Sequence, residues 1–289
     1  MIRRRLAAAL TLLALAPLPA VAYEVKDDAG VSTRFDAPPA RIVSLLPSLT
    51  ETACALRACA RLVAVDRYSN WPPEVAKLPQ VGGGLDPQVE AIVALKPDLV
   101  LMATSSRAAV RLRALGLKVV QLEPRTGADM RRVVASLGRA LQVGGADALL
   151  RNIDEGVQAA AAALPAPLRG TRVYFEVTPT PHAAGRGSFI GELMDALGLV
   201  NIVGPELGPF PHISPELVVR AAPDLIMASR ASLQDMARRP GWPALKALRE
   251  GRTCAFDGAE RDILVRPGPR MPEAARLVAR CVTERMGKQ

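Results

Sequence analysis

The chain has 289 residues and a formal net charge of +9; 49% of its residues are hydrophobic and only 3% are aromatic. This length and hydrophobic fraction suffice for the core of one large domain or two medium-sized ones. The basic residues are scattered, with almost no aromatics among them, which argues against nucleic-acid binding. With two histidines and no Gly-x-Ser-x-Gly, His-Glu-x-x-His or P-loop motif, the sequence also argues against a hydrolase.

Residues 1–22 have the pattern of a secretory signal peptide. Residues 3–5 are all arginine, residues 6–15 form a short apolar run, and residues 20–22 (Ala-Val-Ala) are a small-x-small cleavage site. The apolar run is too short to span a bilayer, and no cysteine follows the cleavage site to carry a lipid. We therefore expect cleavage after Ala22 and export as a soluble protein, most simply to a Gram-negative periplasm.

Strands and helices alternate over the first part of the chain. In chain order they are strand 41–46, a helix capped by Ser48 or Thr50 with Glu51 in its first turn, strand 62–65, helix 86–95, strand 99–103, helix 108–115 and strand 118–122. Strands that alternate with helices indicate a parallel sheet. Residues 23–125 are therefore predicted to form an N-terminal α/β lobe.

An even number of cysteines in an oxidising compartment favours disulfides over metal or redox chemistry. The four cysteines are Cys54, Cys59, Cys254 and Cys281, and they allow three pairings. We favour Cys54–Cys59 and Cys254–Cys281, with one bond in each half of the chain. The first bond requires the helix that contains Cys54 to end before Cys59, because side chains five positions apart in a helix point to different faces. Free buried thiols are the alternative.

Residues 126–168 carry no strand signal. Leucine and valine recur there at helical spacing, and Gly144-Gly145 interrupts the pattern. We predict one long connecting helix, or two helices that abut. A packed helical connector, in place of several strand crossovers, predicts a rigid protein with little opening and closing.

A second alternating series fills residues 169–289. Its elements are strand 172–177, helix 191–197, a helix opened by Ser214-Pro215, strand 225–228, helix 242–248, strand 253–256 and helix 272–286. These residues are predicted to form a C-terminal α/β lobe. The predicted fold class is therefore α/β, with two Rossmann-like lobes of mostly parallel sheets, a long backbone helix joining them and a ligand cleft between them.

Residues 90–100 and 216–226 repeat one pattern. Each segment begins with glutamate, continues as a short helix-like run to Pro-Asp, and turns into an apolar strand-like run. Internal repetition reports architecture, and two copies of this length indicate two similar lobes rather than a solenoid. A cleft between lobes is a common place for a ligand.

Four segments carry a resemblance to a known family. They are residues 41–51 (Arg-Ile-Val-Ser-Leu-Leu-Pro-Ser-Leu-Thr-Glu), 68–72 (Tyr-Ser-Asn-Trp-Pro), 90–100 and 188–190 (Ser-Phe-Ile). The chain resembles the helical-backbone (class III) periplasmic substrate-binding proteins, which serve ABC importers for cobalamin, haem and ferric siderophores. The resemblance covers nearly the whole chain after the signal. The first two segments are most similar to the branch that binds cobalamin (vitamin B12).

The resemblance implies a role for the glutamate that begins each repeat. In such proteins one exposed glutamate on each lobe pairs with arginines of the membrane permease, and Glu90 and Glu216 match those positions. Taken alone, each is only a carboxylate early in a helix, where the helix dipole favours it. The expected partners are therefore the permease subunits of an inner-membrane ABC transporter, and the protein itself is expected to be a monomer.

The cleft is expected to be built from loops at the carboxyl ends of strands. Tyr68 and Phe210 match pocket aromatics of the cobalamin-binding branch, and aromatic rings supply flat apolar area for a corrin or tetrapyrrole face. Ordinary packing is the alternative for both. The full set of candidate ligand-binding residues is Pro47, Ser48, Tyr68, Trp71, Gly84, His182, Phe210, His212, Asp257 and Glu260.

The two histidines each follow a proline in predicted loops near the cleft rim. An imidazole from His182 or His212 can coordinate haem iron or corrin cobalt; a hydrogen bond within the loop is the alternative. Asp257 and Glu260 are candidates for hydrogen bonds to corrin amides. The chain departs from the cobalamin-binding branch at Gly84, where that branch has tryptophan, and at His182, where it has an aromatic residue.

We therefore expect the periplasmic substrate-binding component of an ABC importer. It would capture cobalamin or a related corrinoid as a transported ligand, with no cofactor of its own, no resident metal and no catalytic residue; His182 is the candidate axial contact to a metal in the ligand. The first alternative is a haem- or ferric-siderophore-binding protein on the same scaffold. The alternative from another class is a surface enzyme or chelatase that processes the ligand.

Overall fold

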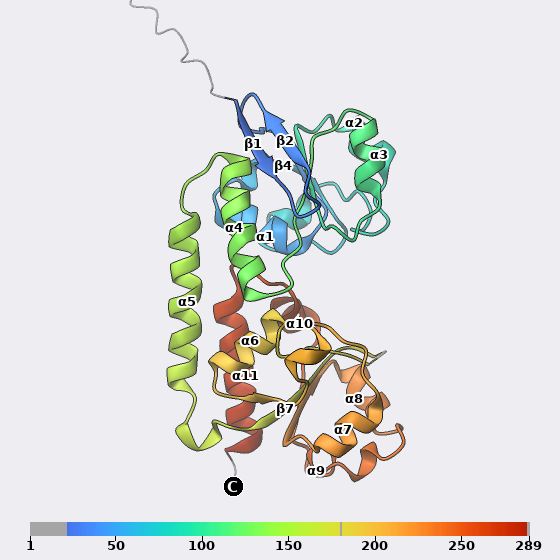
Figure 1. Ribbon diagram of the computed structural model, residues 1–289, viewed down its shortest axis with the longest axis vertical. Coiled ribbons are helices and arrows are strands. Elements are labelled where there is room, and N and C mark those ends of the chain that lie inside the picture. The colour runs from blue at the N-terminus through green and yellow to red at the C-terminus, as the bar shows by residue number, and fades with distance from the viewer. Residues whose placement is uncertain (1–21, 180, 288–289) are drawn as a thin grey trace, which may run out of the picture.

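The computed structural model describes residues 22–179 and 181–287. It has two α/β lobes arranged end to end, with helices α4 (Gly127–Leu141) and α5 (Ala146–Ala163) along one side (Figure 1). The predicted signal peptide lies, apart from Ala22, outside the described residues. Within the described residues no helix is both long and apolar enough to cross a membrane.

The N-terminal lobe is built on a parallel sheet in the order β4-β3-β5-β6. Its strands are β3 (Ile42–Ser44), β4 (Leu62–Val65), β5 (Leu99–Met102) and β6 (Val119–Gln121), and its helices are α1 (Pro47–Ala55), α2 (Val89–Ala94) and α3 (Ala108–Ala114). Every residue of β3, β5 and β6 is buried, because helices cover both faces of a parallel sheet. An antiparallel hairpin of β1 (Tyr23–Lys26) and β2 (Ser32–Phe35) adds Val25 and Phe35 to this core.

The segment 126–168 holds two helices rather than a single one. α4 begins at a capping box formed by Thr126 and Asp129. The C-cap of α4 is Gln142, in the left-handed conformation, and the N-cap of α5 is Gly145, with φ of 94°. Only glycine adopts such a positive φ without strain, so the Gly-Gly pair that interrupts the helical pattern is also the turn between the two helices.

The two helices serve different lobes. Val133 and Leu137 of α4 are buried in the core of the N-terminal lobe. α5 runs beside the last helix, α11 (Met271–Met286), and its Leu149 packs against the cores of both lobes. α5 is therefore the backbone helix that spans the molecule.

The C-terminal lobe has a five-stranded sheet in the order β11-β10-β7-β8, with β9 also pairing with β7. Its strands are β7 (Arg172–Thr178), β8 (His182–Ala183), β9 (Val200–Asn201), β10 (Leu225–Ala228) and β11 (Thr253–Ala255). Its helices besides α11 are α6 (Phe189–Ala196), α7 (Pro215–Ala221), α8 (Arg230–Met236), α9 (Lys246–Arg249) and α10 (Gly258–Val265). All pairings are parallel except that of β7 with β8. The predicted two-lobed α/β fold is confirmed.

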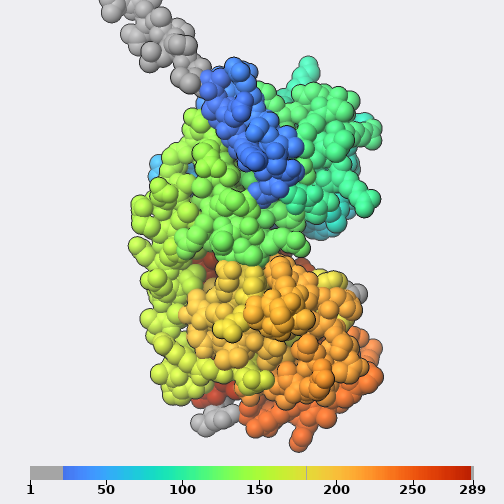
Figure 2. Space-filling model, viewed as in Figure 1, coloured from blue at the N-terminus to red at the C-terminus, as the bar shows by residue number. Residues whose placement is uncertain are grey.

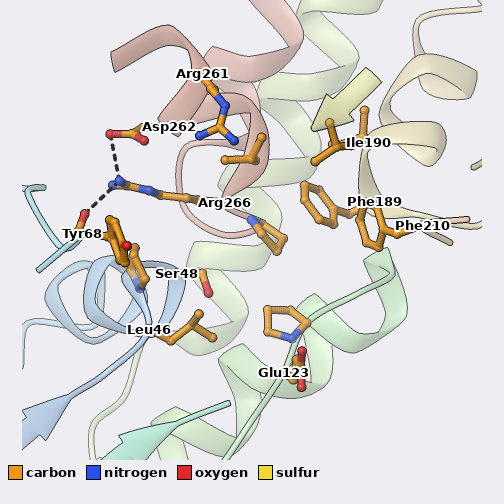
Figure 3. A pocket seen from close by; sticks show the side chains of 15 residues that line it. Leu46, Ser48, Tyr68, Glu123, Phe189, Ile190, Phe210, Arg261, Asp262 and Arg266 are labelled. Carbon is orange, nitrogen blue, oxygen red and sulfur yellow. Dashed lines mark hydrogen bonds and ion pairs between the residues drawn. The ribbon is translucent and has the colours of Figure 1, made fainter. Parts of the chain in front are cut away.

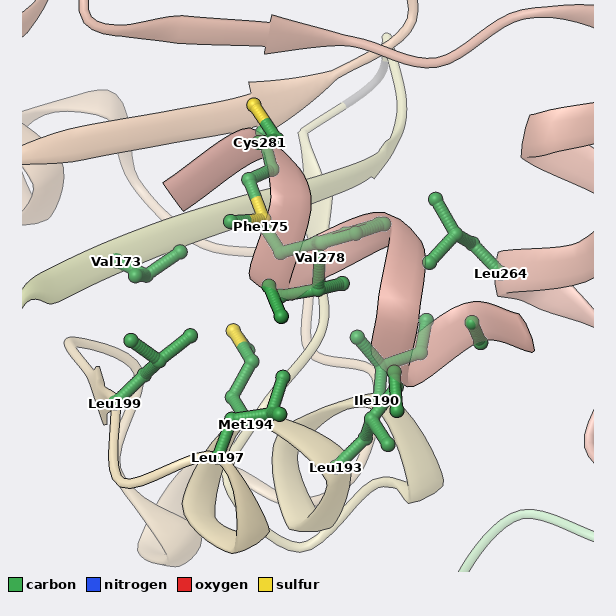
Figure 4. Close-up of a cluster of buried hydrophobic side chains, with 14 of the residues drawn as sticks. Val173, Phe175, Ile190, Leu193, Met194, Leu197, Leu199, Leu264, Val278 and Cys281 are labelled. Atoms are coloured by element: carbon green, nitrogen blue, oxygen red, sulfur yellow. The ribbon is translucent and has the colours of Figure 1, made fainter. Parts of the chain in front are cut away.

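One face of this sheet is covered by α6 and α11. Leu193 and Met194 of α6 and Val278 of α11 pack with Val173 and Phe175 of β7 (Figure 4). Complete burial of each such side chain stabilises the fold by about 1.5–3 kcal/mol. This packing fixes α6 at the edge of the lobe that faces its partner.

Both favoured disulfides are present. Cys54–Cys59 joins the end of α1 to the turn before β4, and Cys254–Cys281 ties β11 to α11. The first bond forms because α1 ends at Ala55, before the second cysteine. The described residues contain no free cysteine.

Candidate functional site

A pocket of about 430 Å³ lies between the two lobes. The molecule is visibly indented there in Figure 2. From the N-terminal lobe, the pocket is lined by loops that follow parallel strands: Leu46 to Ser48 after β3, Tyr68 after β4, and Glu123 and Pro124 after β6. The carboxyl ends of parallel strands meet at one edge of a sheet, which is where open α/β sheets bind ligands.

The opposite wall comes from the C-terminal lobe. Phe189 and Ile190 open α6, and Phe210 lies in the loop before α7. The two phenylalanine rings pack with centroids 5.6 Å apart and face the pocket across from Tyr68 (Figure 3). The remaining lining residues are Val177, Arg261, Asp262, Val265, Arg266 and Pro267. The pocket therefore has apolar walls, with Arg261, Asp262 and Arg266 at one end and Glu123 at the other (Figure 3).

Four of the ten candidate ligand-binding residues line this pocket: Pro47, Ser48, Tyr68 and Phe210. The side chain of Tyr68 stands out among them because it is 59% exposed. Gly83 lies behind its ring, since a Cβ there would sit 3.5 Å from Tyr68 Cε2. The ring is thus supported on one side and open toward the cavity on the other.

Four other candidates lie outside the lining of the pocket. Trp71 packs under the guanidinium of Arg270, 5.3 Å from the ring centroid. Gly84 closely approaches the main chain: a Cβ there would sit 2.8 Å from the carbonyl oxygen of Leu45, so a side chain at this position requires the loop to move. Asp257 accepts a hydrogen bond from the main-chain N–H of Arg230, and Glu260 forms an ion pair with Arg280.

The two histidines face each other rather than the pocket. Their main chains form an antiparallel bridge, and their rings pack edge to face with centroids 5.3 Å apart. Thr178 Oγ1 lies 3.3 Å from His182 Nδ1. Neither histidine is among the residues that line the pocket.

The sequence did not reveal the residues that join the lobes beneath this pocket. We expected Glu51 in the first turn of a helix capped by Ser48 or Thr50, but α1 begins at Pro47, with no side-chain cap and no acidic residue in its first turn. Glu51 is instead buried, and it forms ion pairs with Arg266 and Arg270 of the C-terminal lobe. No periodic pattern in the sequence identifies Arg266 and Arg270 as partners of Glu51.

Phe189 was also missed as a pocket residue. It appeared in the sequence only as part of a Ser-Phe-Ile marker, and Ser188 is the N-cap of α6, accepting a hydrogen bond from the Gly191 N–H. A residue at the first position of a capped helix that faces the other lobe is a signal for a cleft contact, but only once the lobe boundaries are known.

One cation of the pocket has no counter-ion. Arg261 forms no ion pair within residues 22–179 and 181–287, whereas Arg266 is paired with Glu51 and Asp262. The same described residues contain no cluster of three or more potential metal ligands. The pocket therefore offers apolar area, a tyrosine hydroxyl, the Arg261 guanidinium and the Glu123 carboxylate.

The loop that carries Tyr68 is anchored by a buried carboxylate. Asp66 accepts hydrogen bonds from the Tyr68 N–H (3.0 Å) and the Ser69 hydroxyl (2.5 Å). Burial raises the pKa of the Asp66 carboxyl, and these two hydrogen bonds oppose the rise. The Tyr68 backbone is thus held by a carboxylate behind it.

The two glutamates of the repeat lie on short helices at the surface. Glu90 is in the first turn of α2 and forms an ion pair with Arg111 of α3 at 2.7 Å. Glu216 is in the first turn of α7, and the hydrogen bond from the Ser214 side chain lowers the pKa of its carboxyl. In Figure 1, α2 and α7 lie on the side of the molecule away from α5.

A family model described as "Periplasmic binding protein" matches residues 42–258. A vitamin B12-binding protein of Vibrio cholerae is 27% identical over 252 residues, which are 83% of this chain and 88% of that protein. An uncharacterized ABC transporter substrate-binding lipoprotein of Bacillus subtilis, YvrC, is 27% identical over 260 residues, covering 84% of this chain and 80% of that protein.

Solved structures show the same architecture. The periplasmic vitamin B12 binding protein BtuF of Vibrio cholerae aligns with a TM-score of 0.69 and 27% identity, over 87% of this chain and 99% of that chain. The periplasmic heme-binding protein BhuT, in complex with two hemes, aligns with a TM-score of 0.71 and 25% identity, over 85% of this chain and 98% of that chain. Both alignments span the two lobes described above.

Proposed function

The chain belongs to the periplasmic binding protein family, and we propose that it captures cobalamin or a related corrinoid between its lobes and delivers it to the permease of an ABC importer. Substrate-binding proteins of ABC transporters, such as the Bacillus subtilis relative, work with membrane permeases. The Vibrio cholerae relative is named as a vitamin B12-binding protein, not as an enzyme. We propose that the chain does no chemistry on the ligand.

The observation that carries the proposal is a pair of aromatic walls from opposite lobes. Tyr68 comes from the N-terminal lobe, and Phe189 and Phe210 from the C-terminal lobe. The exposed Tyr68 ring gains apolar burial only when a ligand covers it, a gain of about 1.5–3 kcal/mol for complete burial. A flat, largely apolar macrocycle face that fits between such walls matches the ligand named for the Vibrio cholerae relatives.

One alternative ligand has a specific observation in its favour. Haem is also a flat macrocycle, but it carries carboxylates and an iron that accepts a tyrosine oxygen as ligand. The Tyr68 hydroxyl and the Arg261 guanidinium, both in the pocket, would supply these two contacts. The solved haem-binding relative shows that this fold accommodates haem. Neither histidine lines the pocket, so His182 is not our candidate for the axial contact to a metal in the ligand.

The proposed location is the periplasm. The signal-peptide pattern of residues 1–22 supports export, and the Cys54–Cys59 and Cys254–Cys281 disulfides fit an oxidising compartment. We propose that the mature protein is a monomer, and that Glu90 and Glu216 contact arginines of the permease.

Purification followed by ligand titration tests the ligand. The protein is purified from the periplasm, its visible spectrum is recorded, and it is titrated separately with cyanocobalamin and with hemin in a calorimeter. We expect a saturable heat with cyanocobalamin and quenching of Trp71 fluorescence. A Soret band in the purified protein, or binding of hemin without binding of cyanocobalamin, would replace cobalamin with haem.

A further inference from the structure

Glu51 is a buried carboxylate that belongs to one lobe and is neutralised by the other. It projects from α1, and its oxygens accept hydrogen bonds from Arg266 Nη1 (3.0 Å) and from Arg270 Nε and Nη2 (2.9 and 2.7 Å). The side chains of Glu51, Arg266 and Arg270 are 2%, 7% and 8% exposed. Two arginines and one carboxylate leave an excess positive charge, which Asp262 offsets through an ion pair with Arg266 at 2.8 Å.

Arg266 reaches from this ion cluster to the loop that carries Tyr68. Its Nη1 also donates to Asn70 Oδ1 at 2.7 Å, and its Nη2 donates to the carbonyl oxygen of Tyr68 at 2.9 Å. Asn70 in turn donates to Asp262 at 3.0 Å. Figure 3 shows Arg266 between Asp262 and the Tyr68 backbone. One guanidinium thus connects the buried carboxylate to the aromatic wall of the pocket.

The same loop is held from within its own lobe. Asp66 accepts from the Tyr68 N–H, and the Ser69 hydroxyl lies 2.9 Å from that of Thr50. Beyond the loop, Arg270 lies over the ring of Trp71. The N-terminal lobe therefore fixes one side of the loop, and Arg266, held by Glu51, fixes the other.

We propose that Glu51 is a positioning residue for ligand capture. It does not line the pocket within the described residues; it orients Arg266, and Arg266 holds Tyr68 in the conformation that receives the ligand. Removing the carboxylate leaves two arginines buried with too little negative charge, which is strongly unfavourable, so we expect Arg266 to turn away and release the loop. This inference rests on the proposed function, because it concerns the same pocket.

Removing a buried salt bridge that does not contact the Tyr68 loop should leave ligand binding unchanged. The chain contains such a salt bridge for comparison. Glu176 is equally buried and accepts two hydrogen bonds from Arg239, at 2.6 and 3.0 Å. Both residues belong to the C-terminal lobe, and neither contacts the Tyr68 loop in the described structure. Glu176→Gln is therefore the matched control for Glu51→Gln, since both remove one buried, arginine-paired charge.

The first test measures affinity for cyanocobalamin by calorimetry. We expect Glu51→Gln to weaken binding about tenfold or more, the loss expected when hydrogen bonds to a charged group are broken, and Glu176→Gln to leave it unchanged. Combining Glu51→Gln with Tyr68→Ala should weaken binding no further than Tyr68→Ala alone, because the two act through one element. Unchanged affinity in Glu51→Gln, an equal loss in Glu176→Gln, or additive losses would each overturn the proposal.

The second test needs no ligand and therefore separates this inference from the proposed function. Trp71 is 42% exposed and lies on Arg270, whereas Trp242 is fully buried, so acrylamide quenching of tryptophan fluorescence reports chiefly on Trp71. We expect quenching to increase in Glu51→Gln relative to the wild type. Equal quenching in the wild type and Glu51→Gln overturns the inference, even if the wild type binds hemin rather than cyanocobalamin.

A third variant covers the case in which Glu51→Gln fails to fold. Asn70 is exposed, and Asn70→Ala removes its hydrogen bonds to Arg266 and Asp262 without uncovering a buried charge. It should fold and lower ligand affinity, because Arg266 keeps its ion pairs with Glu51 and Asp262 but loses one hydrogen bond to the loop. Wild-type affinity in Asn70→Ala would contradict the positioning role.

Discussion

Tyr68 is the residue at which the sequence and the pocket agree most directly. Its motif indicated a pocket aromatic, and the structure places its exposed ring at the pocket wall opposite Phe210. We predict that Tyr68→Ala and Phe210→Ala each weaken binding of cyanocobalamin, by about tenfold or more, because each removes aromatic contact area of the kind that dominates binding energy.

Isothermal calorimetry measures this loss. Val110→Ala is the control: Val110 is 75% exposed on α3 and does not line the pocket, so its affinity should match the wild type. Equal affinity in wild type and Tyr68→Ala would remove Tyr68 from the binding surface.

Other residues show where sequence reasoning stops. Gly84 was identified as a departure from the cobalamin-binding branch, but its contact with the Leu45 carbonyl depends on how two loops pack. From the local pattern, Glu51 was assigned only to a helix start. Its arginine partners could not be identified, because they lie 215 and 219 positions further along the chain. Local patterns predict local structure, and a pair so distant in sequence becomes visible only when both lobes are in place.

Among the elements, the two disulfides close loops of very different length. Cys54–Cys59 links residues 5 positions apart, and Cys254–Cys281 links residues 27 positions apart. In the chain-entropy model a longer loop restricts the unfolded state more, which gives about 2 kcal/mol for the first bond and about 3.5 kcal/mol for the second. We predict that replacing both cysteines of a pair by serine lowers the free energy of unfolding more for the second pair.

Urea denaturation of the two double variants under identical conditions checks this order. The oxidised wild type, which has both bonds, serves as the common reference. A larger loss for the Cys54–Cys59 pair would contradict the entropic argument.

A second prediction at the level of elements concerns the contact between α6 and α4. Glu192 of α6 accepts a hydrogen bond from the Gly127 N–H at the start of α4, at 2.8 Å. Burial raises the pKa of the Glu192 carboxyl above its ordinary value of 4.5, and this hydrogen bond opposes the rise. A raised pKa means that the folded state holds the proton more tightly, so this contribution to stability is complete below pH 4.5 and is lost as pH rises through the folded-state pKa.

Glu192→Gln removes this titration and keeps an oxygen for the Gly127 N–H. We predict that the stability of the wild type relative to Glu192→Gln decreases as pH rises from about 4 to 7. Urea midpoints of both proteins across this range give the difference. A difference that stays constant or grows with pH would mean that the carboxyl titrates with an ordinary or lowered pKa.

The elements themselves were largely readable from the sequence. Alternating apolar runs and helix signals predicted the parallel strands, and Gly144-Gly145 marked the turn between α4 and α5. The assignment of α4 to the N-terminal core was not readable, because Val133 and Leu137 show only that a helix has an apolar face. Which lobe covers that face depends on tertiary packing.

For the molecule as a whole, the two repeated glutamates supply a test of transport. Glu90 and Glu216 lie on α2 and α7, away from the pocket. We predict that the double variant Glu90→Ala/Glu216→Ala binds cyanocobalamin as the wild type does and supports less uptake, because it loses charged contacts to the permease. Uptake of labelled cobalamin by cells that express the cognate permease measures the effect.

The matched control is Glu24→Ala/Glu284→Ala, which removes two other exposed glutamates and the same net charge. Its uptake should equal that of the wild type. Loss of ligand affinity in Glu90→Ala/Glu216→Ala would place these residues in the cleft, and equal uptake in all three proteins would refute the docking role.

The ion cluster of Glu51 also has a consequence for the order in which the molecule is made. The chain emerges from its amino end, so α1 is complete long before Arg266 and Arg270 exist, and during that time the Glu51 carboxylate has no partner and is best left in water. The two arginines that neutralise this buried carboxylate of the N-terminal lobe therefore come from a segment near the end of the chain. A fragment that stops before Arg266 contains every strand of both sheets and still lacks both partners of Glu51, so competence to capture the ligand is a property of the completed polypeptide.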